Sequence, residues 1–500
     1  MRALVSVWDK TGLVAFAEGL TGLGVELVAS GGTAEALATA GIPHLEVAEV
    51  TGAPEMLSGR VKTLHPSIHG GILADRSRPE HLADLAARGI APIDLVVCNL
   101  YPFRSDPSVE LIDVGGPTMV RAAAKNFAHV AVVTDPADYG EVLDELRREG
   151  SLGDATRRRL ARAAFAHTAA YDAAIVAWLD GDEELPPSLH LTLERREELR
   201  YGENPHQRGA RYAAGADLWD GVVQLSGREL SYLNLFDADA AWGLAHELAA
   251  LRPDGAAAVI VKHANPCGAA LGADLPEAYR RALEADPLSA FGGVVALPGE
   301  VDLALGEALV AGPLADVLVA SAVSAEAAQL LAARRKNMRV LVAPPPRPPG
   351  RSLRQLAGTW LVQGPDRFLA GRDSWTVASK RSPSAEEWDD LELAWRVCAR
   401  SSSNAVVLAK DGQVLGVGCG QQSRVDAAAI AARKAAGRAV GGAGASDAFF
   451  PFRDGLDAVA DAGVAAVIQP GGSLRDDEVI AAADERGVAM VLTGERHFRH

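Results

Sequence analysis

The sequence predicts an α/β protein with more than one domain, and two observations lead to that prediction. Apolar segments that suit strands alternate with amphipathic segments that suit helices at residues 2–7, 10–24, 25–30, 33–41, 94–100 and 129–135. This alternation is typical of a parallel sheet with helical crossovers. The chain also has 500 residues, which exceeds what one hydrophobic core usually supports. We therefore expect two or more α/β domains.

The first domain boundary is predicted from a change in composition. An Ala- and Arg-rich helical pattern at 156–179 leads into an acidic, proline-containing segment at 180–190. We expect a first domain of residues 1–195 and a second region of residues 196–500. A proline-rich connector at 343–351 divides that second region near 343–355.

The two parts of the second region show a faint similarity that would fit a duplication. An Asp/Ser-Ala-Phe turn stands beside an apolar segment in "DPLSAFGGVVAL", around Phe291, and in "SDAFFPFRDGLDAV", around Phe449. One shared tripeptide leaves the duplication open.

Overall composition limits the possible partners and compartments. Hydrophobic residues make up 48% of the chain, no apolar stretch approaches the ~20 residues of a membrane span, and the N-terminus becomes polar too soon for a signal peptide. The net charge of −16 repels nucleic acid, and the one dense basic run, "RRRLAR", lies in an expected helix. We expect a cytoplasmic protein that binds small molecules and neither nucleic acid nor a membrane.

The cysteines give no sign of a disulfide framework or a structural zinc site. Cys98, Cys267, Cys398 and Cys419 lie far apart without a CxxC pair. Reduced and mostly buried thiols are expected.

The segment "ASGGTAEAL" follows one strand and opens a helix, with Ser30, Gly31, Gly32 and Thr33 at the junction. Glycines let a ligand approach the backbone, and a helix N-terminus favours an anion. Phosphate fits this site, although a glycine-rich turn with no ligand also explains it. The segment lacks the spacing of a P-loop and of a dinucleotide-binding fold.

A second group of polar residues follows in the first domain. "GRVKTLHPSIHGG" gathers Arg60, Lys62, Thr63, His65 and His69, and no acidic third ligand accompanies the two histidines, which disfavours a metal site. Further candidates for the same cleft come from "CNLYPF" and "IDVGGPTMVRAAAKN", and they are Asn99, Tyr101, Asp113, Arg121 and Lys125. Each of these residues could also simply lie at a strand end or on the surface of a helix.

In the second region an apolar strand at 256–261 ends at Lys262 and His263. A turn of Asn265, Pro266 and Gly268 is expected to follow. Ligands collect at such strand ends in open α/β sheets, although the two basic residues would also mark a strand that simply reaches water.

Three other segments complete the second region. "RYGENPHQ" (200–207) has no helical or strand period and reads as a surface loop. Residues 401–424 predict a hairpin with an Asp-Gly type I′ turn, and Asn404 and Arg424 lie outside its two ends. "TGERHFRH" should finish a strand at the surface.

Together these motifs identify a family. "SGGTAEAL", "GRVKTLHPSIHGGIL", "IDVGGPTMVRAAAKN", "RYGENPHQ", "VKHANPCG", "SAFGGVVAL", "GCGQQSR", "SDAFFPFRD" and "RHFRH" occur in the order seen in the AICAR transformylase/IMP cyclohydrolase family. The resemblance spans essentially the whole chain. It implies an N-terminal methylglyoxal-synthase-like parallel-sheet domain that closes formyl-AICAR to IMP. It also implies two cytidine-deaminase-like α/β units that transfer a formyl group from the co-substrate 10-formyltetrahydrofolate to AICAR.

The same resemblance argues against metal chemistry. Zinc deaminases carry HxE and PCxxC motifs, whereas "HANPCGAA" has Asn265 at the general-base position and no second cysteine after Cys267. No metal is expected.

For the first domain, the resemblance implies that Lys62, Tyr101, Asp113 and Lys125 surround the ring that closes. Ser6, Lys10, Ser30, Gly31, Gly32, Thr33, Arg60, Thr63 and Asn99 would bind the rest of the substrate. The chain departs from the family at Trp8, where a serine is expected.

For the transferase, the resemblance implies that His263 accepts the proton of the AICAR amine. Lys262 would stabilise the oxyanion or protonate the departing folate nitrogen, and Asn404 is also expected to be catalytic. The implied substrate-binding residues are Arg200, Tyr201, His206, Asn234, Phe291, Gly292, Asp316, Arg424, Phe449, Arg496 and His500. Gly455 stands where asparagine is common, which puts one hydrogen bond to the folate in doubt.

The family's transferase sites form between two subunits, so a homodimer is expected with these sites at its interface.

Two other functions also fit parts of the sequence. One is a nucleotide-sensing regulatory protein that uses the first domain to bind a ligand, and the other is a metal-dependent deaminase.

Overall fold

The computed structural model describes residues 1–348 and 350–500. Pro349, which falls in the predicted division near 343–355, lies outside the described residues. The chain forms two compact units, Met1–Thr192 and Leu193–His500, and each is described here by itself. Within the described ranges, no helix is both long and apolar enough to cross a membrane.

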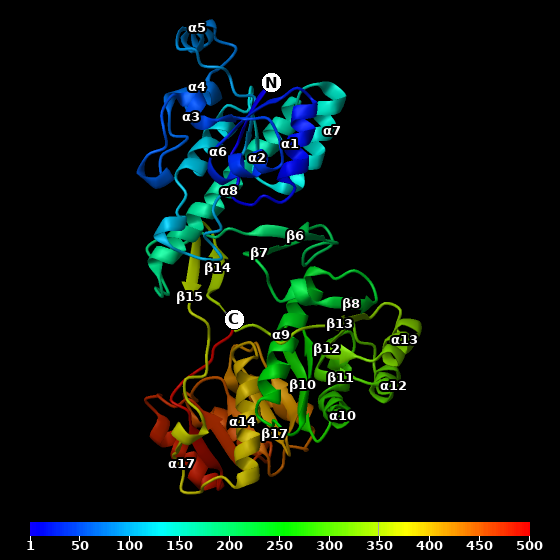
Figure 1. Ribbon diagram of the computed structural model, residues 1–500. Helices are drawn as coiled ribbons and strands as arrows, with labels where there is room; N and C mark the ends of the chain where they lie inside the picture. Colours follow the sequence, from blue (N-terminus) through cyan, green and yellow to red (C-terminus); the bar gives the residue numbers. More distant parts are fainter. Residues whose placement is uncertain (349) are drawn as a thin grey trace. The chain divides into compact units, whose positions relative to one another are not determined.

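The first unit is a parallel α/β domain (Figure 1). Its strands run in the order β3 (Leu45–Glu46), β2 (Glu26–Ala29), β1 (Arg2–Val5), β4 (Leu95–Val97) and β5 (Ala131–Val133). The helices are α1 (Leu13–Gly22), α2 (Gly31–Thr39), α3 (Val47–Thr51), α4 (Pro66–Leu73), α5 (Pro79–Ala87), α6 (Gly115–Lys125), α7 (Tyr139–Glu149) and α8 (Asp154–Asp180). The parallel-sheet prediction and the long helix predicted at 156–179 are both confirmed.

Helices cover both faces of this sheet, which explains the unbroken apolar runs of its strands. α1, α2 and α7 pack on the face of Ala3 and Val5, whereas α4, α6 and α8 pack on the face of Leu4. The three β1 residues are 0–1% exposed. Because all five strands are parallel, the loops after β1, β2 and β4 meet at one edge of the sheet.

The second unit contains a twelve-stranded sheet. Its order is β16 (Thr376–Val377), β21 (Ala489–Leu492), β20 (Ala466–Gln469), β19 (Ala443–Ser446), β17 (Val406–Lys410), β18 (Gln413–Gly418), β10 (Asn265–Gly272), β9 (Ala256–Lys262), β11 (Val294–Val301), β12 (Val317–Val323), β13 (Arg339–Val342) and β8 (Val223–Ser226). Two separate hairpins pair β6 (Glu194–Leu199) with β7 (Gly209–Ala213) and β14 (Ser352–Leu356) with β15 (Thr359–Gln363).

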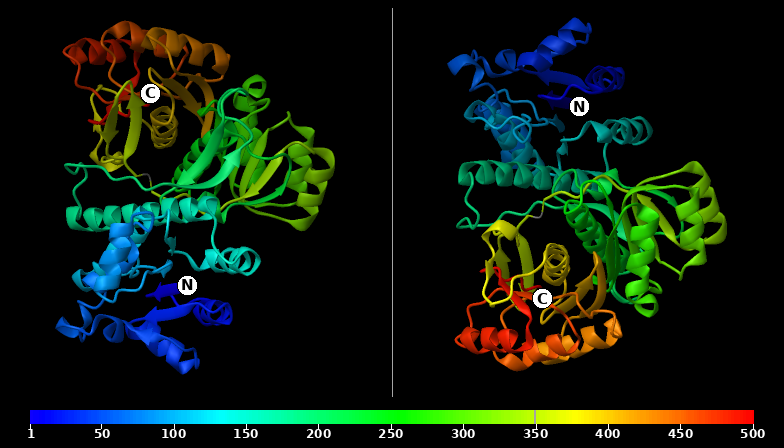
Figure 2. Two further views of the ribbon diagram at one scale, coloured as in Figure 1. Left: turned by 90° about the horizontal axis from the view of Figure 1, so that it is seen from above. Right: turned by 90° about the horizontal axis from the view of Figure 1, so that it is seen from below.

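The sheet order shows a duplication and confirms the two-unit fold class. Read from its outer edge to the centre, the first half is β8-β13-β12-β11-β9-β10, and the second half is β16-β21-β20-β19-β17-β18. Each half has an antiparallel edge strand, three parallel strands and a central hairpin. The halves join where β10 pairs with β18. In both views of Figure 2 they lie side by side, green against yellow to red.

The tripeptide similarity that suggested this duplication is wrong in its alignment. Phe291 lies before β11, whereas Phe449 lies after β19, the counterpart of β11 in the second half. The duplication is a property of the topology, and the two Ala-Phe turns occupy different places in it.

Helices again cover both faces of the sheet. α9 (Tyr232–Ala249) and α14 (Ala385–Ala399) share one core, in which Trp242 and Trp395 are 1% and 0% exposed. The opposite face packs against α10 (Leu275–Ala285), α12 (Leu303–Ala311) and α13 (Ala325–Arg334) in the first half and α15 (Arg424–Ala435), α16 (Arg453–Asp461) and α17 (Asp476–Arg486) in the second. A short α11 (Pro287–Ala290) precedes β11.

The turn predicted after His263 is misplaced. β9 continues to Lys262 and β10 begins at Asn265, so the turn consists of His263 and Ala264, with φ of 54° and 55°. Pro266 lies inside β10, where a register shift between Pro266 and Gly268 forms a bulge. A bulge tolerates proline because it interrupts the ladder hydrogen bonds. The Asp-Gly type I′ turn of the second hairpin is confirmed, since Asp411 and Gly412 both have positive φ.

We expect Gly268→Ala to lower the free energy of unfolding by about 1–3 kcal/mol, because a Cβ there would lie 2.0 Å from the Ala282 carbonyl oxygen of α10. Gly416→Ala should behave alike in the other half, since its Cβ would lie 2.1 Å from the Ala431 oxygen. Gly243→Ala, with open space in α9, is the control and should be neutral or stabilising. Urea unfolding measures all three. Equal midpoints for the three variants would contradict the packing argument.

Candidate functional site

The first unit holds a cavity of about 640 Å³ at the edge where the loops after β1, β2 and β4 meet. It lies among segments far apart in the sequence. Every residue that the sequence assigned to the cyclohydrolase site lines this cavity except Lys125, namely Ser6, Lys10, Ser30, Gly31, Gly32, Thr33, Arg60, Lys62, Thr63, Asn99, Tyr101 and Asp113.

One wall of the cavity is the N-terminus of α2. The first N–H groups of a helix have no acceptor within the helix, and here they belong to Gly31 and Gly32. The N-cap Ser30 makes no side-chain capping bond, so its hydroxyl stays available to a ligand. Gly31 has φ of 54°, a conformation that favours glycine. The Thr33 hydroxyl is already used, because it accepts from Val7 N at 3.0 Å and donates to Val7 O at 3.1 Å.

Two lysines lie beside this helix end, and Arg60 lines the same cavity. Lys62 Nζ lies 2.8 Å from Glu55 Oε2, and a Cβ built on Gly31 would lie 2.9 Å from that ammonium group. Lys10 Nζ donates to the Trp8 carbonyl at 3.3 Å, and Arg60 pairs with Glu110 at 2.5 Å. An anion here would meet a helix N-terminus and three positive charges, which suits a phosphate group. The sequence analysis did not predict Glu55 or Glu110 as members of this site. Glu55 is close to the basic cluster in the chain, whereas Glu110 is close to it only in the fold.

The opposite wall carries the groups suited to proton transfer. Burial raises the pKa of the Asp113 carboxyl, although its bond from Gly116 N at 2.8 Å acts in the other direction. Tyr101 is 41% exposed and meets the Trp8 ring edge-on at a centroid distance of 5.6 Å. Asn99 orients that loop, because its side-chain oxygen accepts from Trp8 N and Asp9 N.

Lys125 lies at the C-terminal end of α6 and lines a different cavity, of about 690 Å³. Its neighbours there are His69, Arg121, Arg158 and Arg162. The structure of a single chain therefore does not bring Lys125 to the other predicted cyclohydrolase residues. Lys125 lies twelve residues after Asp113, at the opposite end of α6, and this distance along the helix separates the two residues.

In the second unit, side chains bind all four backbone polar groups of the His263–Ala264 turn. Asp237 of α9 accepts from His263 N at 3.2 Å and from Ala264 N at 2.7 Å. Asn265 Nδ2 donates to the His263 carbonyl at 3.0 Å, and Arg499 Nη1 donates to the Ala264 carbonyl at 2.6 Å. The His263 side chain is exposed, and its imidazole makes no hydrogen bond or ion pair with the described residues.

Lys262 lies directly before this turn, and its ammonium group donates to the Phe291 carbonyl at 2.7 Å. Gly292 follows with φ of 72°, and its N–H donates to the Leu314 carbonyl. Asp316 N donates to the Gly293 carbonyl at 2.9 Å. The segment after α11 therefore connects Lys262, Phe291, Gly292 and Asp316.

Asn404 and Arg424 form a second connected group. Arg424 Nη1 donates to Asn404 Oδ1 at 2.7 Å, and its other nitrogens bind Ser446 Oγ and the buried Asp447 at 3.0 Å. Phe449 follows Asp447 by two residues. This network joins the ends of the second hairpin to the end of β19.

The C-terminal tail alternates between buried and exposed side chains. Arg496, Phe498 and His500 are exposed, whereas Glu495, His497 and Arg499 are wholly or partly buried. Arg496 and Arg424 both lie over the Phe498 ring, at 4.5 and 5.9 Å from its centroid, and the His500 ring contacts it at 5.6 Å. Sequence reasoning missed Phe498, which links three of the predicted substrate-binding residues.

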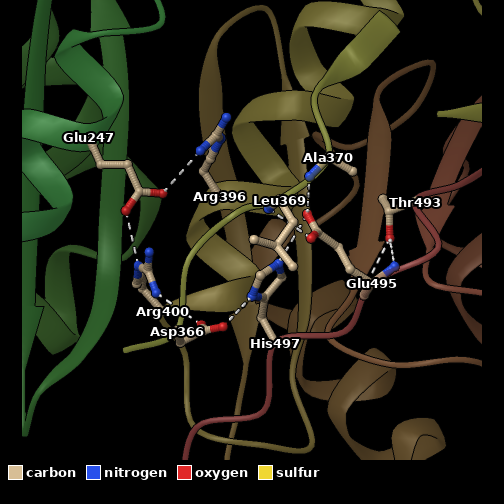
Figure 3. Close-up of polar contacts among 9 residues, drawn as sticks. All are labelled: Glu247, Asp366, Leu369, Ala370, Arg396, Arg400, Thr493, Glu495 and His497. Carbon is tan, nitrogen blue, oxygen red and sulfur yellow. Dashed lines mark hydrogen bonds and ion pairs between the residues drawn. The ribbon is translucent and has the colours of Figure 1, made fainter. Parts of the chain in front are cut away.

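The buried face of the tail is held by a charged network (Figure 3). His497 Nδ1 lies 2.7 Å from Asp366 Oδ1, Arg400 binds Asp366 at 3.2 Å, and Arg400 also binds Glu247 at 3.0 Å. Burial acts to raise the pKa of Asp366, but His497 and Arg400 outweigh it and lower that pKa. Glu495 accepts from Leu369 N and Ala370 N. This network fixes the tail.

Three of the remaining predicted residues, Arg200, Tyr201 and His206, lie in the loop between β6 and β7, and the fourth, Asn234, lies in the first turn of α9. Arg200 stacks on Tyr201 at 4.6 Å and donates to its hydroxyl at 2.7 Å, and His206 is exposed. Burial lowers the pKa of the nearby Arg339, Asp316 opposes that shift, and Arg200 adds to it. Asn234 caps α9 by accepting from Ser231. The described contacts do not join Arg200, Tyr201 or His206 to the His263 turn.

Comparisons with known proteins assign the chain to a family. A family model described as "AICARFT/IMPCHase bienzyme" matches residues 123–434, and one described as "MGS-like domain" matches residues 12–126. A solved structure titled "Crystal structure of ForH" is 42% identical, covers 36% of this chain and 99% of its own, and gives a TM-score of 0.34. Among the described residues, no group of three or more His, Cys, Asp or Glu side chains is placed to hold a metal ion.

We expect a purine nucleoside monophosphate to change the tryptophan fluorescence of this protein, because Trp8 lines the first-unit cavity and is 51% exposed. A ligand there would displace water from the indole. Trp8→Phe should abolish the change while calorimetry still detects binding. An undiminished fluorescence change in Trp8→Phe would place the ligand elsewhere.

Proposed function

Because the chain belongs to the AICARFT/IMPCHase bienzyme family, we propose that its two units divide the family's two reactions between the sites described above. The protein is a bifunctional enzyme of purine biosynthesis, with formyltransferase and IMP cyclohydrolase activities. Its formyl transfer depends on folate, and the formyl donor we propose is 10-formyltetrahydrofolate, with no metal required. The match to the second unit also disfavours a purely nucleotide-sensing protein.

Ring closure is assigned to the cavity of the first unit. The phosphate of formyl-AICAR would lie at the N-terminus of α2, against Ser30, Lys10 and Arg60. The carboxamide nitrogen attacks the formyl carbon and gives up one proton, and an oxyanion forms. Its oxygen then leaves as water while the former formamide nitrogen loses its proton and forms the C=N bond of the new ring. Lys62 supplies the positive charge for that oxyanion.

Proton transfer in ring closure is assigned to Asp113 and Tyr101. A carboxyl with a raised pKa is suited to take the carboxamide proton and return it to the departing oxygen, and Tyr101 can supply the second proton. Lys125 lines a separate cavity, so this mechanism gives it no step.

Formyl transfer is assigned to the His263 turn, and one observation carries this assignment. Side chains bind every backbone polar group of the turn, yet the exposed imidazole is unpaired in the described structure. A fixed backbone with a free imidazole suits a general base. His263 takes a proton from the AICAR amine as its nitrogen attacks the formyl carbon. Lys262 stabilises the oxyanion, and the bond to the folate nitrogen breaks with protonation of that nitrogen.

Several other residues complete the proposed transferase site. Asn404 and Arg424 form one connected pair, and Arg496 and His500 extend from the exposed face of the tail towards Phe498. Phe449, Phe291, Gly292 and Asp316 are proposed to shape the folate and AICAR pockets. Arg200, Tyr201 and His206 are proposed to act across a subunit interface.

A homodimer is proposed from the exposed surfaces of the second unit. Among the described residues the β14–β15 hairpin pairs with no other strand, and a two-stranded hairpin alone is marginally stable. Trp360 and Leu361 on it are 55% and 57% exposed. A second copy of the chain would cover them and would let the β6–β7 loop reach a transferase site. We propose a cytoplasmic location, where both substrates are small soluble molecules.

Lys62→Ala and His263→Ala should silence different reactions. Lys62→Ala should slow ring closure about a hundredfold, equivalent to ~3 kcal/mol of transition-state stabilisation, and leave formyl transfer intact. His263→Ala should slow formyl transfer by about 10²–10⁴-fold and leave ring closure intact. Chromatography of the products separates the cases, since formyl-AICAR accumulates in the first variant and AICAR remains in the second. Near wild-type formyl transfer by His263→Ala would refute its role.

Dilution should reduce the specific activity of formyl transfer but not of ring closure. The transferase residues are proposed to come from two chains, whereas one unit of one chain contains the cyclohydrolase cavity. Light scattering at the same concentrations should show dimers separating into monomers as formyl transfer falls. A fully active monomer would contradict the shared site.

A further inference from the structure

The duplication places two closely similar turns in the second unit. The His263–Ala264 turn joins β9 to β10, and the Asp411–Gly412 turn joins β17 to β18, the same strands in the other half. All four residues have positive φ, between 53° and 73°. Each half therefore contains a two-residue turn of the same kind at the end of its central hairpin.

An aspartate caps each turn from the same place in the fold. Asp237 is the sixth residue of α9, counting Tyr232 as the first, and Asp390 is the sixth residue of α14, counting Ala385 as the first. Asp390 accepts from Asp411 N at 2.9 Å and from Gly412 N at 2.7 Å. Asp237 accepts from the two N–H groups of its own turn at 3.2 and 2.7 Å. The two carboxylates make the same pair of bonds.

An arginine binds a carbonyl of each turn, but from unrelated segments. Arg281 of α10 donates to the Asp411 carbonyl, and its second nitrogen donates to the Leu271 carbonyl at 2.7 Å. Arg499 of the C-terminal tail donates to the Ala264 carbonyl at 2.6 Å and to the Arg400 carbonyl at 2.5 Å. Each arginine thus ties a turn to a neighbouring backbone segment.

The turns differ in what they carry and in how much strain they hold. The second turn ends in Gly412, which adopts positive φ freely, whereas His263 and Ala264 each place a Cβ in the left-handed region. Ala264 is buried, so its polar groups cannot turn to water instead. The first turn therefore depends more on its cap than the second does.

We infer that Asp237 and Arg499 are positioning residues for formyl transfer, which hold the backbone of His263 so that only its side-chain torsions remain free. This inference rests on the proposed role of His263. Neither residue need touch substrate. With the cap removed, the turn relaxes towards less strained torsions and the imidazole moves away from the amine. Displacements of about 1 Å can cost around a hundredfold in rate.

The second turn supplies matched controls for a test on the full-length enzyme. Asp237→Asn and Asp390→Asn each replace one carboxylate oxygen by a donor and lose one turn bond. Arg499→Met and Arg281→Met each replace an arginine by an unbranched side chain that lacks the guanidinium group. Steady-state kinetics of both reactions and thermal unfolding are measured for all four. Thermal unfolding reports whether the second unit is folded, and ring closure in the first unit normalises the enzyme concentration.

We expect Asp237→Asn and Arg499→Met to lower kcat for formyl transfer about 10- to 100-fold, with KM for AICAR changed by less than about threefold. Arg499→Lys should recover part of the loss because it restores one donor to the Ala264 carbonyl. Asp390→Asn and Arg281→Met should lose comparable thermal stability yet keep kcat within about twofold of the wild type. Equal losses of kcat in both pairs would overturn the inference and leave a general structural role.

A double variant tests whether Asp237 acts through His263. Asp237→Asn should cause no further loss of formyl transfer in a His263→Ala background, because there is no imidazole left to position. The same fold-loss in both backgrounds would overturn the inference. A His263→Ala enzyme that still transfers formyl would instead overturn the proposed function. An inactive His263→Ala beside fully active Asp237→Asn and Arg499→Met would overturn the positioning role alone.

Discussion

The architecture of the second unit depends on one constraint, the need to satisfy the backbone of two hairpin turns, one at His263–Ala264 and one at Asp411–Gly412. A two-residue turn leaves N–H and C=O groups that the ladder does not use, and buried groups of that kind must find partners. At His263–Ala264 the partners come from α9, from the start of β10 and from the last residues of the chain. Asn265 also accepts from Ser402 N of the second half, so the turn ties the two halves together. The tail must therefore lie in a fixed path, and the network of Asp366, His497 and Glu495 in Figure 3 keeps it there. Because side chains alternate along an extended segment, the same path exposes Arg496, Phe498 and His500.

The first unit satisfies a different constraint, the gathering of positive charge in a chain of net charge −16. A parallel sheet brings the loops after β1, β2 and β4 to one edge, and Lys10, Arg60 and Lys62 line the cavity there although Lys10 is far from the other two in the chain. Glu55 pairs with Lys62, and Glu110 pairs with Arg60. An incoming phosphate would compete with those carboxylates for the same charges. A bound anion would therefore replace Glu55 and Glu110 as the partner of Lys62 and Arg60.

The sequence anticipated much of the fold, and most of the cyclohydrolase residues predicted from it line the first-unit cavity. The failures of these predictions share a physical origin. Strand and helix alternation is a local property of the chain, and it was correct in the first unit. The His263–Ala264 turn was misplaced because Asn265, Pro266 and Gly268 are the stronger local turn signals. What fixes the true turn is a carboxylate 26 residues away and a guanidinium 235 residues away. No local preference could reveal either. Thr33 was expected to bind the ligand, yet its hydroxyl bonds to the backbone N–H and carbonyl of Val7. The sequence motif alone does not tell which way this hydroxyl points. The duplication is seen in the strand order and in the positions of Asp237 and Asp390, and the tripeptide shared by the two halves did not locate it.

The two departures from the family pattern differ in how far the fold constrains them. Trp8 is exposed at the cavity mouth, and its backbone N–H is held by Asn99, so its side chain is free to vary without disturbing the loop. Gly455 is buried at the start of α16, and a Cβ there would lie 2.6 Å from the Phe450 ring. Phe450 is itself 0% exposed, and its N–H is bound by Gln469, so the ring cannot withdraw without disturbing the core. An asparagine at 455 therefore requires a different residue, or a different ring position, at 450. Gly455 and Phe450 form a coupled pair in this chain, and a substitution at one is expected to need a change at the other.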